Sequence, residues 1–570
     1  MEKKKILICF IMFILLTGLV TCCGQENQRE ENAAVDAKNE KYGYDSPVKI
    51  KVGLSYAVDL TWIGDETPED NAWMDLYKEN NIFPEILYSV NESQAESRLE
   101  SAIMSGNYPD VFCGGLQEYK NWADNGVSAD ITEAYEKYAT DELKKYLESD
   151  GGKGLEMLKI DGRLYGLPRI DSPYEQIPVM FIRQDWLDRL GLEIPTTMEE
   201  LKTVAHAFTY DDPDGNGVDD TYGIGIDGIN VVNNTVGDCS PIFAAFGVYL
   251  GNDTMAFVEG ENGEPVWGGT NISGMHLALQ FLQELYADGS ICKDAVTMDS
   301  NAVFEDAGEG RCGIWFGPVW GGMVPASDAA KKDINARISA VSIPSGQGRE
   351  IVKEYLPSSV RSITCVSSQC ENPEVLIKLM NLSVQKVSYP ESEEEYRKYL
   401  GDNENYTGSK TSLIYVQDTQ NYEGYKKLKK ALETGDSSEL NLVQKMDMAK
   451  MESYLRASED GEFDPNDSQQ SLGISYYTVY GGEHSAWSVI DKMIQEDAFV
   501  YPVYNDLMTN IMIEKAATLK YMTVEMIIKI MAGQDVSSYN QFLDVWYAAG
   551  GQDIVDEVNL WYEQNRENKK

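Results

Sequence analysis

Hydrophobic side chains in the first part of the chain recur at spacings that separate strands from helices. Residues 48–54 alternate between hydrophobic and polar side chains, whereas Trp73, Leu76 and Tyr77 follow helical spacing. The pattern predicts strands over 48–54, 85–90 and 109–112 and helices over 71–80 and 93–104. Such alternation of strands and helices predicts an α/β fold with a parallel sheet and crossover helices.

The pattern continues beyond residue 160 with two extended segments and two helices. The extended segments cover 164–168 and 179–182, and a helix that starts at Asp185 ends at Gly191. Thr197, followed three residues later by Glu200, forms the signature of a capping box. A second amphipathic helix is therefore expected to begin directly after Thr197.

An acidic loop over residues 209–225 has the ligand spacing of a calcium site. Oxygen donors stand at alternate positions, with a backbone carbonyl among them and Gly217 at the sharp turn. The candidate ligands are Asp212, Asp214, Asn216, Val218 through its carbonyl, and Asp220. An EF-hand would place a glutamate where this chain has Gly223, so no helix–loop–helix sensor is expected. We expect a structural Ca²⁺ that holds the loop; the alternative is a solvated turn without an ion.

The N-terminus has the order of a secretory signal. Residues 1–5 are basic, residues 6–20 are almost entirely hydrophobic, and a Leu-x-x-Cys sequence ends at Cys22. We expect residues 1–21 to be a signal peptide, with Cys22 lipidated (palmitate) and Cys23 as a weaker alternative. The polar residues 22–46 then form a flexible tether. The predicted location is extracytoplasmic, anchored by lipid to the cell membrane; an uncleaved anchor helix is the alternative.

Composition narrows the possible partners. The chain has 570 residues, 43% of them hydrophobic, and a net charge of −45. Its length favours two lobes, and its charge argues against nucleic acid or anionic lipid as partners. Six cysteines outside the N-terminal region have no metal or disulfide spacing. These are Cys113, Cys239, Cys292, Cys312, Cys365 and Cys370.

Several sequence blocks, in order, carry a family resemblance. The blocks are SAIMSGNYPDVF, DGRLYGLPR, FIRQDWLDRLGLEIPTTMEEL, AFTYDDPDGNGVDDTYG, GIWFGPVWG and FLDVWYAAGGQDIVDEVNLWY. Together they resemble the extracellular solute-binding lipoproteins of bacterial ABC importers, in the large oligosaccharide-binding branch related in fold to maltose-binding protein. The resemblance implies a calcium ion in the acidic loop. Thr221 or water would supply the last ligand.

The resemblance also implies a type II periplasmic-binding-protein-like fold. Each of its two lobes is a mixed, mostly parallel sheet with flanking helices, and a hinge joins them. Lobe one is expected to comprise 47–170 and 345–395, and lobe two 171–344 and 396–570. The chain should cross between lobes near 168–180 and 342–364. The polar region 392–471 reads as a helical insertion whose packing the sequence does not predict.

Sugar sites pair aromatic platforms with a few polar groups, so aromatic residues at strand ends are the candidates for ligand binding. The sequence GIWFGPVW places Trp320 after a Gly-Pro turn, and Trp315 and Phe316 just before it. Any of these three side chains could instead belong to the core. Further ligand-binding candidates are Tyr56, Trp62, Gln117, Glu118, Tyr174 and Phe243, and one of Tyr477 and Tyr480.

The function implied by the resemblance is capture of an oligosaccharide between the lobes and its delivery to the ABC permease subunits, by a monomer without catalytic activity. Two alternatives remain open. A secreted glycoside hydrolase needs a pair of carboxylates, which 93 acidic residues cannot exclude. A sensor that reports to a membrane kinase would use the same fold and site. A peptide or a modified sugar would also suit an aromatic-lined cleft.

Overall fold

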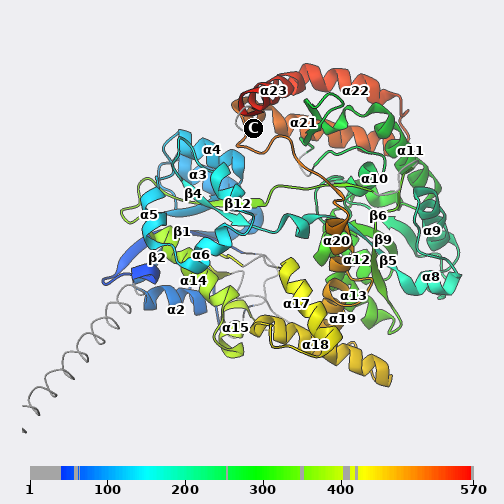
Figure 1. Cartoon of the computed structure of the whole chain (residues 1–570), viewed down its shortest axis with the longest axis horizontal. Helices are drawn as coiled ribbons and strands as arrows, with labels where there is room; N and C mark the ends of the chain where they lie inside the picture. Colours follow the sequence, from blue (N-terminus) through cyan, green and yellow to red (C-terminus); the bar gives the residue numbers. More distant parts are fainter. Residues whose placement is uncertain are drawn as a thin grey trace, which may run out of the picture.

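The computed structural model describes residues 40–56, 62, 65–251, 254–346, 352–401, 411–417 and 421–566. The predicted signal peptide, Cys22 and most of the predicted tether lie outside these residues. Within them, two separate sheets with flanking helices form two lobes (Figure 1). No helix of the described segments is both long enough and hydrophobic enough to cross a membrane.

The first lobe is built on a five-stranded sheet in the order β2-β1-β3-β12-β4. Its strands are β1 (Val48–Tyr56), β2 (Ile82–Asn91), β3 (Val111–Gly114), β4 (Gly166–Ile170) and β12 (Val360–Val366). β1 is parallel to β2 and β3, whereas β12 is antiparallel to β3 and β4. Ile50, Val52 and Leu54 are buried in alternation, which confirms the strand predicted from the sequence.

Helices of the first lobe come mostly from the connections between these strands. They are α2 (Ala72–Glu79), α3 (Ala95–Met104), α4 (Leu116–Asp124), α5 (Thr132–Tyr138), α6 (Asp141–Leu147), α7 (Lys153–Met157), α14 (Val375–Ser388) and α15 (Glu393–Leu400). α14 is buried along most of its length and packs against α5, α6 and β12. Because α14 is packed inside the first lobe, the chain returns to this lobe after it has formed the second sheet.

The second lobe contains a four-stranded sheet in the order β10-β5-β9-β6. Its strands are β5 (Val179–Arg183), β6 (Tyr222–Gly225), β9 (Cys312–Gly317) and β10 (Ile338–Val341). Among adjacent strands, only β6 and β9 are parallel; β5 is antiparallel to both β9 and β10. Both sheets are mixed and mostly parallel in strand direction, as expected, because only β12 in the first sheet and only β5 in the second run against the other strands. β5 and β12 are the first strands after the chain changes lobe, and each enters its sheet against the direction of its neighbours.

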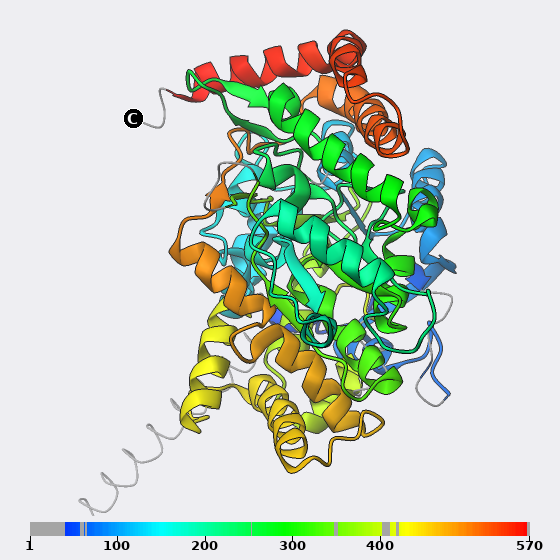
Figure 2. The same cartoon turned by 90° about the vertical axis from the view of Figure 1, so that its right-hand side faces the viewer.

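Helices surround the second sheet and extend from it. They are α8 (Gln184–Leu190), α9 (Met198–Tyr210), α10 (Ser240–Ala245), α11 (Ile272–Asp288), α12 (Ser300–Gly308), α13 (Met323–Lys332), α17 (Asn421–Thr434), α18 (Leu442–Asp460), α19 (Ser468–Tyr480), α20 (Ala486–Gln495), α21 (Asn510–Met531), α22 (Ser538–Trp546) and α23 (Gln552–Arg566). The second lobe also contains two short two-stranded ribbons, which are β7 (Phe257–Glu259) with β8 (Pro265–Trp267) and β11 (Glu354–Tyr355) with β13 (Phe499–Val500). The α17–α19 group and the C-terminal helices lie at opposite ends of the molecule (Figure 2).

Local signals at the ends of α8 and α9 act as predicted. α8 ends at Gly191, which adopts the left-handed conformation with φ +67°. The Thr197 hydroxyl accepts the amide hydrogen of Glu200 at 3.3 Å, and the Glu200 carboxylate accepts the Thr197 amide hydrogen at 3.2 Å. This capping box fixes the start of α9, the helix that leads into the acidic loop.

The chain passes between the sheets from β4 to β5 and again from β10 to β12, within the two segments predicted for crossings. A third passage leads from residue 417 to α17. Tyr399, Leu400, Ile414 and Val416 pack in the core of the first lobe. Residues 396–401 and 411–417 therefore belong to the first lobe, although the sequence assigned everything after 395 to the second.

Candidate functional site

Trp320 lies on η5 (Val319–Gly322), a short 3₁₀ turn directly after the central strand β9. Its side chain is 39% exposed, and its ring lies 6.4 Å from the Phe304 ring, centre to centre. The Gly-Pro step at Gly317 and Pro318 turns the chain out of the sheet before this residue. Trp320 is thus the aromatic of this segment with surface to offer a ligand.

Trp315, Phe316 and Phe243 do not face a cleft. Their exposed fractions are 0%, 1% and 0%, because β9 is a central strand covered on both faces and α10 lies in the core. Trp315 stacks on Phe181 with 5.6 Å between ring centres. Its indole N–H donates to the Gly321 carbonyl at 3.0 Å, so Trp315 holds the turn that carries Trp320.

A cluster of charged residues lies at the hinge, where the segments that follow β4 and precede β12 cross between the lobes. Asp171, which follows β4, accepts from Arg169 Nε at 3.3 Å and lies 3.4 Å from Arg361 Nε of β12. The Asp171 amide also donates to the Ser359 carbonyl at 2.9 Å, which ties the two crossing segments together. Both guanidinium groups remain partly exposed. None of these residues was predicted, although Arg169 and Asp171 lie in the first predicted crossing and Ser359 and Arg361 in the second, which was a usable signal.

Glu175 is the fourth member of this cluster and is 9% exposed. It lies on η2 (Pro173–Gln176), the segment that connects the lobes and packs against η5. Burial and, to a smaller extent, the Asp171 charge raise the pKa of Glu175 from its ordinary 4.5 to about 8, against the opposing effect of the two arginines. At neutral pH this carboxyl group is therefore mostly protonated.

Tyr174 opens a group of aromatic rings beside the hinge. Its ring lies 5.4 Å from Phe499 and 6.3 Å from Tyr422, and Tyr422 lies 5.9 Å from Trp487. Tyr501, two residues after Phe499, is exposed. The group brings η2, α17, α20 and β13 together, so the structure joins Tyr174 to aromatic residues that lie more than 240 positions later in the sequence.

The remaining candidates are dispersed. Tyr56 and Trp62 are partly exposed and contact each other edge to face at 6.4 Å. Gln117 donates to the Ile513 carbonyl of α21 at 3.3 Å, and Glu118 accepts the Gly115 amide hydrogen at 2.9 Å. The Gln117 amide thus bridges to the C-terminal helices and the Glu118 carboxylate caps α4, so both groups are already engaged.

Tyr477 and Tyr480, both on α19, pack beside other tyrosines. The Tyr477 ring lies 5.7 Å from Tyr454, and Tyr480 stacks on Tyr476 at 6.2 Å. Tyr480 also comes close enough to Glu175 for the carboxylate charge to contribute to a raised pKa of the phenol, after the larger effect of burial. Of these two alternatives, Tyr480 is the residue next to the hinge cluster.

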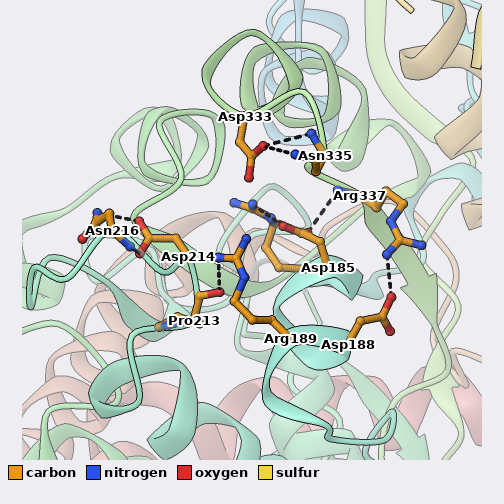
Figure 3. A network of polar contacts seen from close by, with 10 residues as sticks. Asp185, Asp188, Arg189, Pro213, Asp214, Asn216, Asp333, Asn335 and Arg337 are labelled. Atoms are coloured by element: carbon orange, nitrogen blue, oxygen red, sulfur yellow. Dashed lines mark hydrogen bonds and ion pairs between the residues drawn. The ribbon is translucent and has the colours of Figure 1, made fainter. Parts of the chain in front are cut away.

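The acidic loop folds around its own side chains. Gly217 adopts φ +77°, as its predicted turn requires, and its amide donates to both Asp212 carboxylate oxygens at 3.2 and 3.1 Å. Figure 3 shows Asn216 turned toward Asp214 and Arg189 of α8 reaching the Pro213 carbonyl, at 2.8 Å. Arg189 thereby attaches the loop to the second lobe.

The loop's donors suit a hard cation in kind, although they do not stand in a closed cage. Across the described segments, no three His, Cys, Asp or Glu side chains gather closely enough to hold a metal ion. The Asn216 amide nitrogen lies between two carboxylates instead, 2.7 Å from Asp214 and 3.2 Å from Asp220. This partly positive NH₂ group stands where a cation would neutralise both acids. Burial first, and then Asp212 and Asp220, raise the pKa of Asp214, as expected of uncompensated acids.

Two other proposed ligands take different positions. The Val218 side chain is an exposed hydrocarbon, so the backbone carbonyl of Val218 is its only group suited to a cation. Thr221 is buried, and its hydroxyl donates to the Phe208 carbonyl at 2.8 Å. Thr221 therefore anchors the loop to α9 and does not turn toward the acidic side chains.

Comparison with known families and proteins gives matches over much of the chain. A family model described as bacterial extracellular solute-binding protein matches residues 35–379. The polygalacturonan/rhamnogalacturonan-binding protein YtcQ of Bacillus subtilis is 30% identical over 39% of this chain and 41% of its own length. The fructooligosaccharide ABC transporter substrate-binding protein FusA of Streptococcus pneumoniae is 27% identical over 53% of this chain and 56% of its own. The matches thus span about half the length of these relatives.

A solved structure of an extracellular solute-binding protein from Bifidobacterium longum subsp. infantis has the same fold. It superposes with a TM-score of 0.63 at 18% identity, over 92% of this chain and 99% of the other. The agreement therefore extends beyond the residues that the family model matches.

Proposed function

Because the chain belongs to the bacterial extracellular solute-binding proteins, we propose that it captures an oligosaccharide between its lobes and delivers it to an ABC permease. It does so as a monomer tethered to the outer face of the membrane. The two relatives named above are described as a polygalacturonan/rhamnogalacturonan-binding protein and a fructooligosaccharide ABC transporter substrate-binding protein, which supports a carbohydrate ligand. Delivery to a permease and signalling to a kinase would use this same site.

One observation carries the proposal: a partly exposed tryptophan stands at the end of a central strand, beside the hinge. η5 bears Trp320 and packs against η2, the segment that connects the lobes. Arg169 and Arg361 at the same hinge keep donors free for hydroxyl or carboxylate groups. An apolar ring for a sugar face, with polar groups near it, is the combination that carbohydrate sites use.

We further propose binding without turnover. A glycoside hydrolase presents one protonated and one ionised carboxyl group to its substrate. Glu175 is mostly protonated at neutral pH, but Glu175 and Asp171 are each only 9% exposed, and Asp171 is held by two arginines. Neither carboxyl group is presented to a sugar, which favours a role in shaping the hinge.

Replacing Trp320 tests the site. Trp320→Ala is expected to weaken binding of the preferred oligosaccharide about thirtyfold, since loss of a stacking aromatic costs about 2 kcal/mol. Stability should fall by less than the roughly 3–5 kcal/mol typical of a fully buried tryptophan. Titration calorimetry measures the first and thermal unfolding the second.

Tyr521→Ala on α21 is the matched control, because Tyr521 is an exposed aromatic far along the chain from η5. This variant should retain full affinity. Full affinity in Trp320→Ala, together with ready unfolding, would instead assign Trp320 to the core and move the ligand to other aromatics.

We also propose that Ca²⁺ occupies the acidic loop, held by Asp212, Asp214, Asn216, Asp220 and the Val218 carbonyl. Carboxylate and amide oxygens are its usual ligands, and the cation would neutralise repulsion among these acids. Its role is to hold the loop that joins α9 to β6. The ion lies on the second lobe and takes no part in contacting the sugar.

Lipid attachment at Cys22 is the last part of the proposal, and it rests on the N-terminal sequence alone. Cys22→Ser is expected to abolish incorporation of a labelled fatty acid and to leave an unprocessed precursor. Cys23→Ser, the matched control, should label normally. Full labelling of Cys22→Ser would move the site to Cys23 or elsewhere.

A further inference from the structure

The first lobe carries a pocket of about 470 Å³ that includes none of the residues discussed above. It lies among the segment before β1, the start of α6, and α14 with the residue that follows it. Tyr42, Glu142, Lys145, Asn381 and Tyr389 are among its lining residues. Its volume is within the range of about 300–1,000 Å³ typical of small-molecule sites.

A buried amide fixes the floor of this pocket. Asn381 is 1% exposed, and its side chain joins three separate segments. Its oxygen accepts the Thr140 amide hydrogen at 3.1 Å, and its nitrogen donates to the Lys41 and Tyr138 carbonyls at 2.7 and 2.9 Å. Breaking any of these bonds would leave a buried polar group unpaired, so the pocket keeps its shape without a ligand.

The rim combines aromatic rings with unused polar groups. Tyr42 is partly exposed and Tyr389 is 38% exposed. Burial and the nearby Glu142 charge raise the pKa of the Tyr42 phenol, which places Glu142 and Tyr42 beside each other. In the described part of the chain, the Glu142, Lys145 and Gln385 side chains have no hydrogen-bond or ion-pair partner. They therefore remain available to a ligand.

These groups fit a polyhydroxylated ligand. Phenol rings can cover the C–H face of a sugar, the carboxylates can accept from its hydroxyls, and the ammonium and amide can donate to them. Asp141 and Glu142 outnumber Lys145, so the local charge disfavours phosphate or an anionic headgroup. We propose that this pocket is a second carbohydrate site, for a neutral sugar unit, separate from the interlobe site. The inference rests on the proposed function in that its ligand is a carbohydrate.

Hydrogen–deuterium exchange, with mass spectrometry of the peptides, tests the pocket locally. The mature protein would be measured with and without a neutral fructooligosaccharide at saturating concentration. Protection is expected in peptides from 138–147 and 378–389. The double variant Lys145→Ala/Gln385→Ala removes two side chains that the fold does not use. In this variant, the ligand concentration that gives half-maximal protection should rise at least tenfold.

The variants separate the two sites. Trp320→Ala should lose protection around η5 but keep it in the pocket, and the double variant should show the reverse. Pocket protection that disappears in Trp320→Ala would make it a remote effect of interlobe binding and overturn the second site. Absence of pocket protection at saturation would also overturn it. Pocket protection without any binding near η5 would overturn the proposed function and support the pocket.

Discussion

Glu175→Gln is expected to remove a marked loss of stability that the protein shows as pH rises from about 4.5 to about 8. In the folded protein burial raises the pKa of Glu175 to about 8, whereas the unfolded chain has the ordinary value of 4.5. Between these values the folded state holds a proton that the unfolded state has released. The free energy of unfolding therefore falls with rising pH over this window, by on the order of 5 kcal/mol at most.

Glutamine keeps the size of the protonated side chain but cannot ionise. Denaturant unfolding at pH 5 and pH 8.5 should thus show the variant gaining several kcal/mol relative to the wild type at the higher pH, with about 5 kcal/mol as the upper value. Glu193→Gln, at an exposed position, is the matched control and should follow the wild type. Equal pH dependence in wild type and Glu175→Gln would mean that this carboxyl group ionises normally in the folded protein.

Removal of calcium is expected to destabilise the second lobe. An ion that binds only the folded state stabilises it by RT ln(1 + [L]/Kd), which is about 2.7 kcal/mol at a hundredfold excess. A chelator should therefore lower the melting temperature, and Asp214→Ala should lower it and abolish the response. The raised pKa of Asp214 adds a pH dependence: affinity should decrease as pH falls, because the protonated carboxyl cannot bind the ion.

Asp219→Ala is the matched control for this experiment. Asp219 lies in the same loop and is exposed, but it is not among the proposed ligands. It should respond to chelation as the wild type does. A melting curve that chelation leaves unchanged in the wild type would favour the solvated turn, with the Asn216 amide as the neutralising group.

Local chemistry made several elements predictable. The alternation at 48–54 and the Thr197–Glu200 capping box act within a few residues, and the structure reproduces both. The two predicted crossings follow from the family resemblance, and the structure passes between its sheets within both segments. By contrast, Trp315 and Trp320 stand in one short segment and differ only in what covers them. A central strand is buried on both faces, so alternation cannot indicate which aromatic is exposed.

Contacts between distant segments could not be predicted from the sequence. Arg169 and Arg361 share Asp171 only because β12 pairs with β4, although 192 positions separate the two arginines. The Trp73 indole donates to the Tyr399 carbonyl at 3.0 Å, which draws the end of α15 into the first lobe. The polar composition of this region gave no sign of that partner. Such contacts are set by tertiary packing, which a single sequence without pairing information does not reveal.

Titration of the mature wild-type protein with fructooligosaccharides and oligogalacturonides, followed by mass analysis of the recovered sugar, tests the central claim most directly. Capture without turnover predicts saturable binding of at least one of these oligosaccharides and recovery of the ligand at its original length. Shorter products that accumulate with time would contradict the account and favour a hydrolase, and failure to bind either class would contradict the proposed ligand.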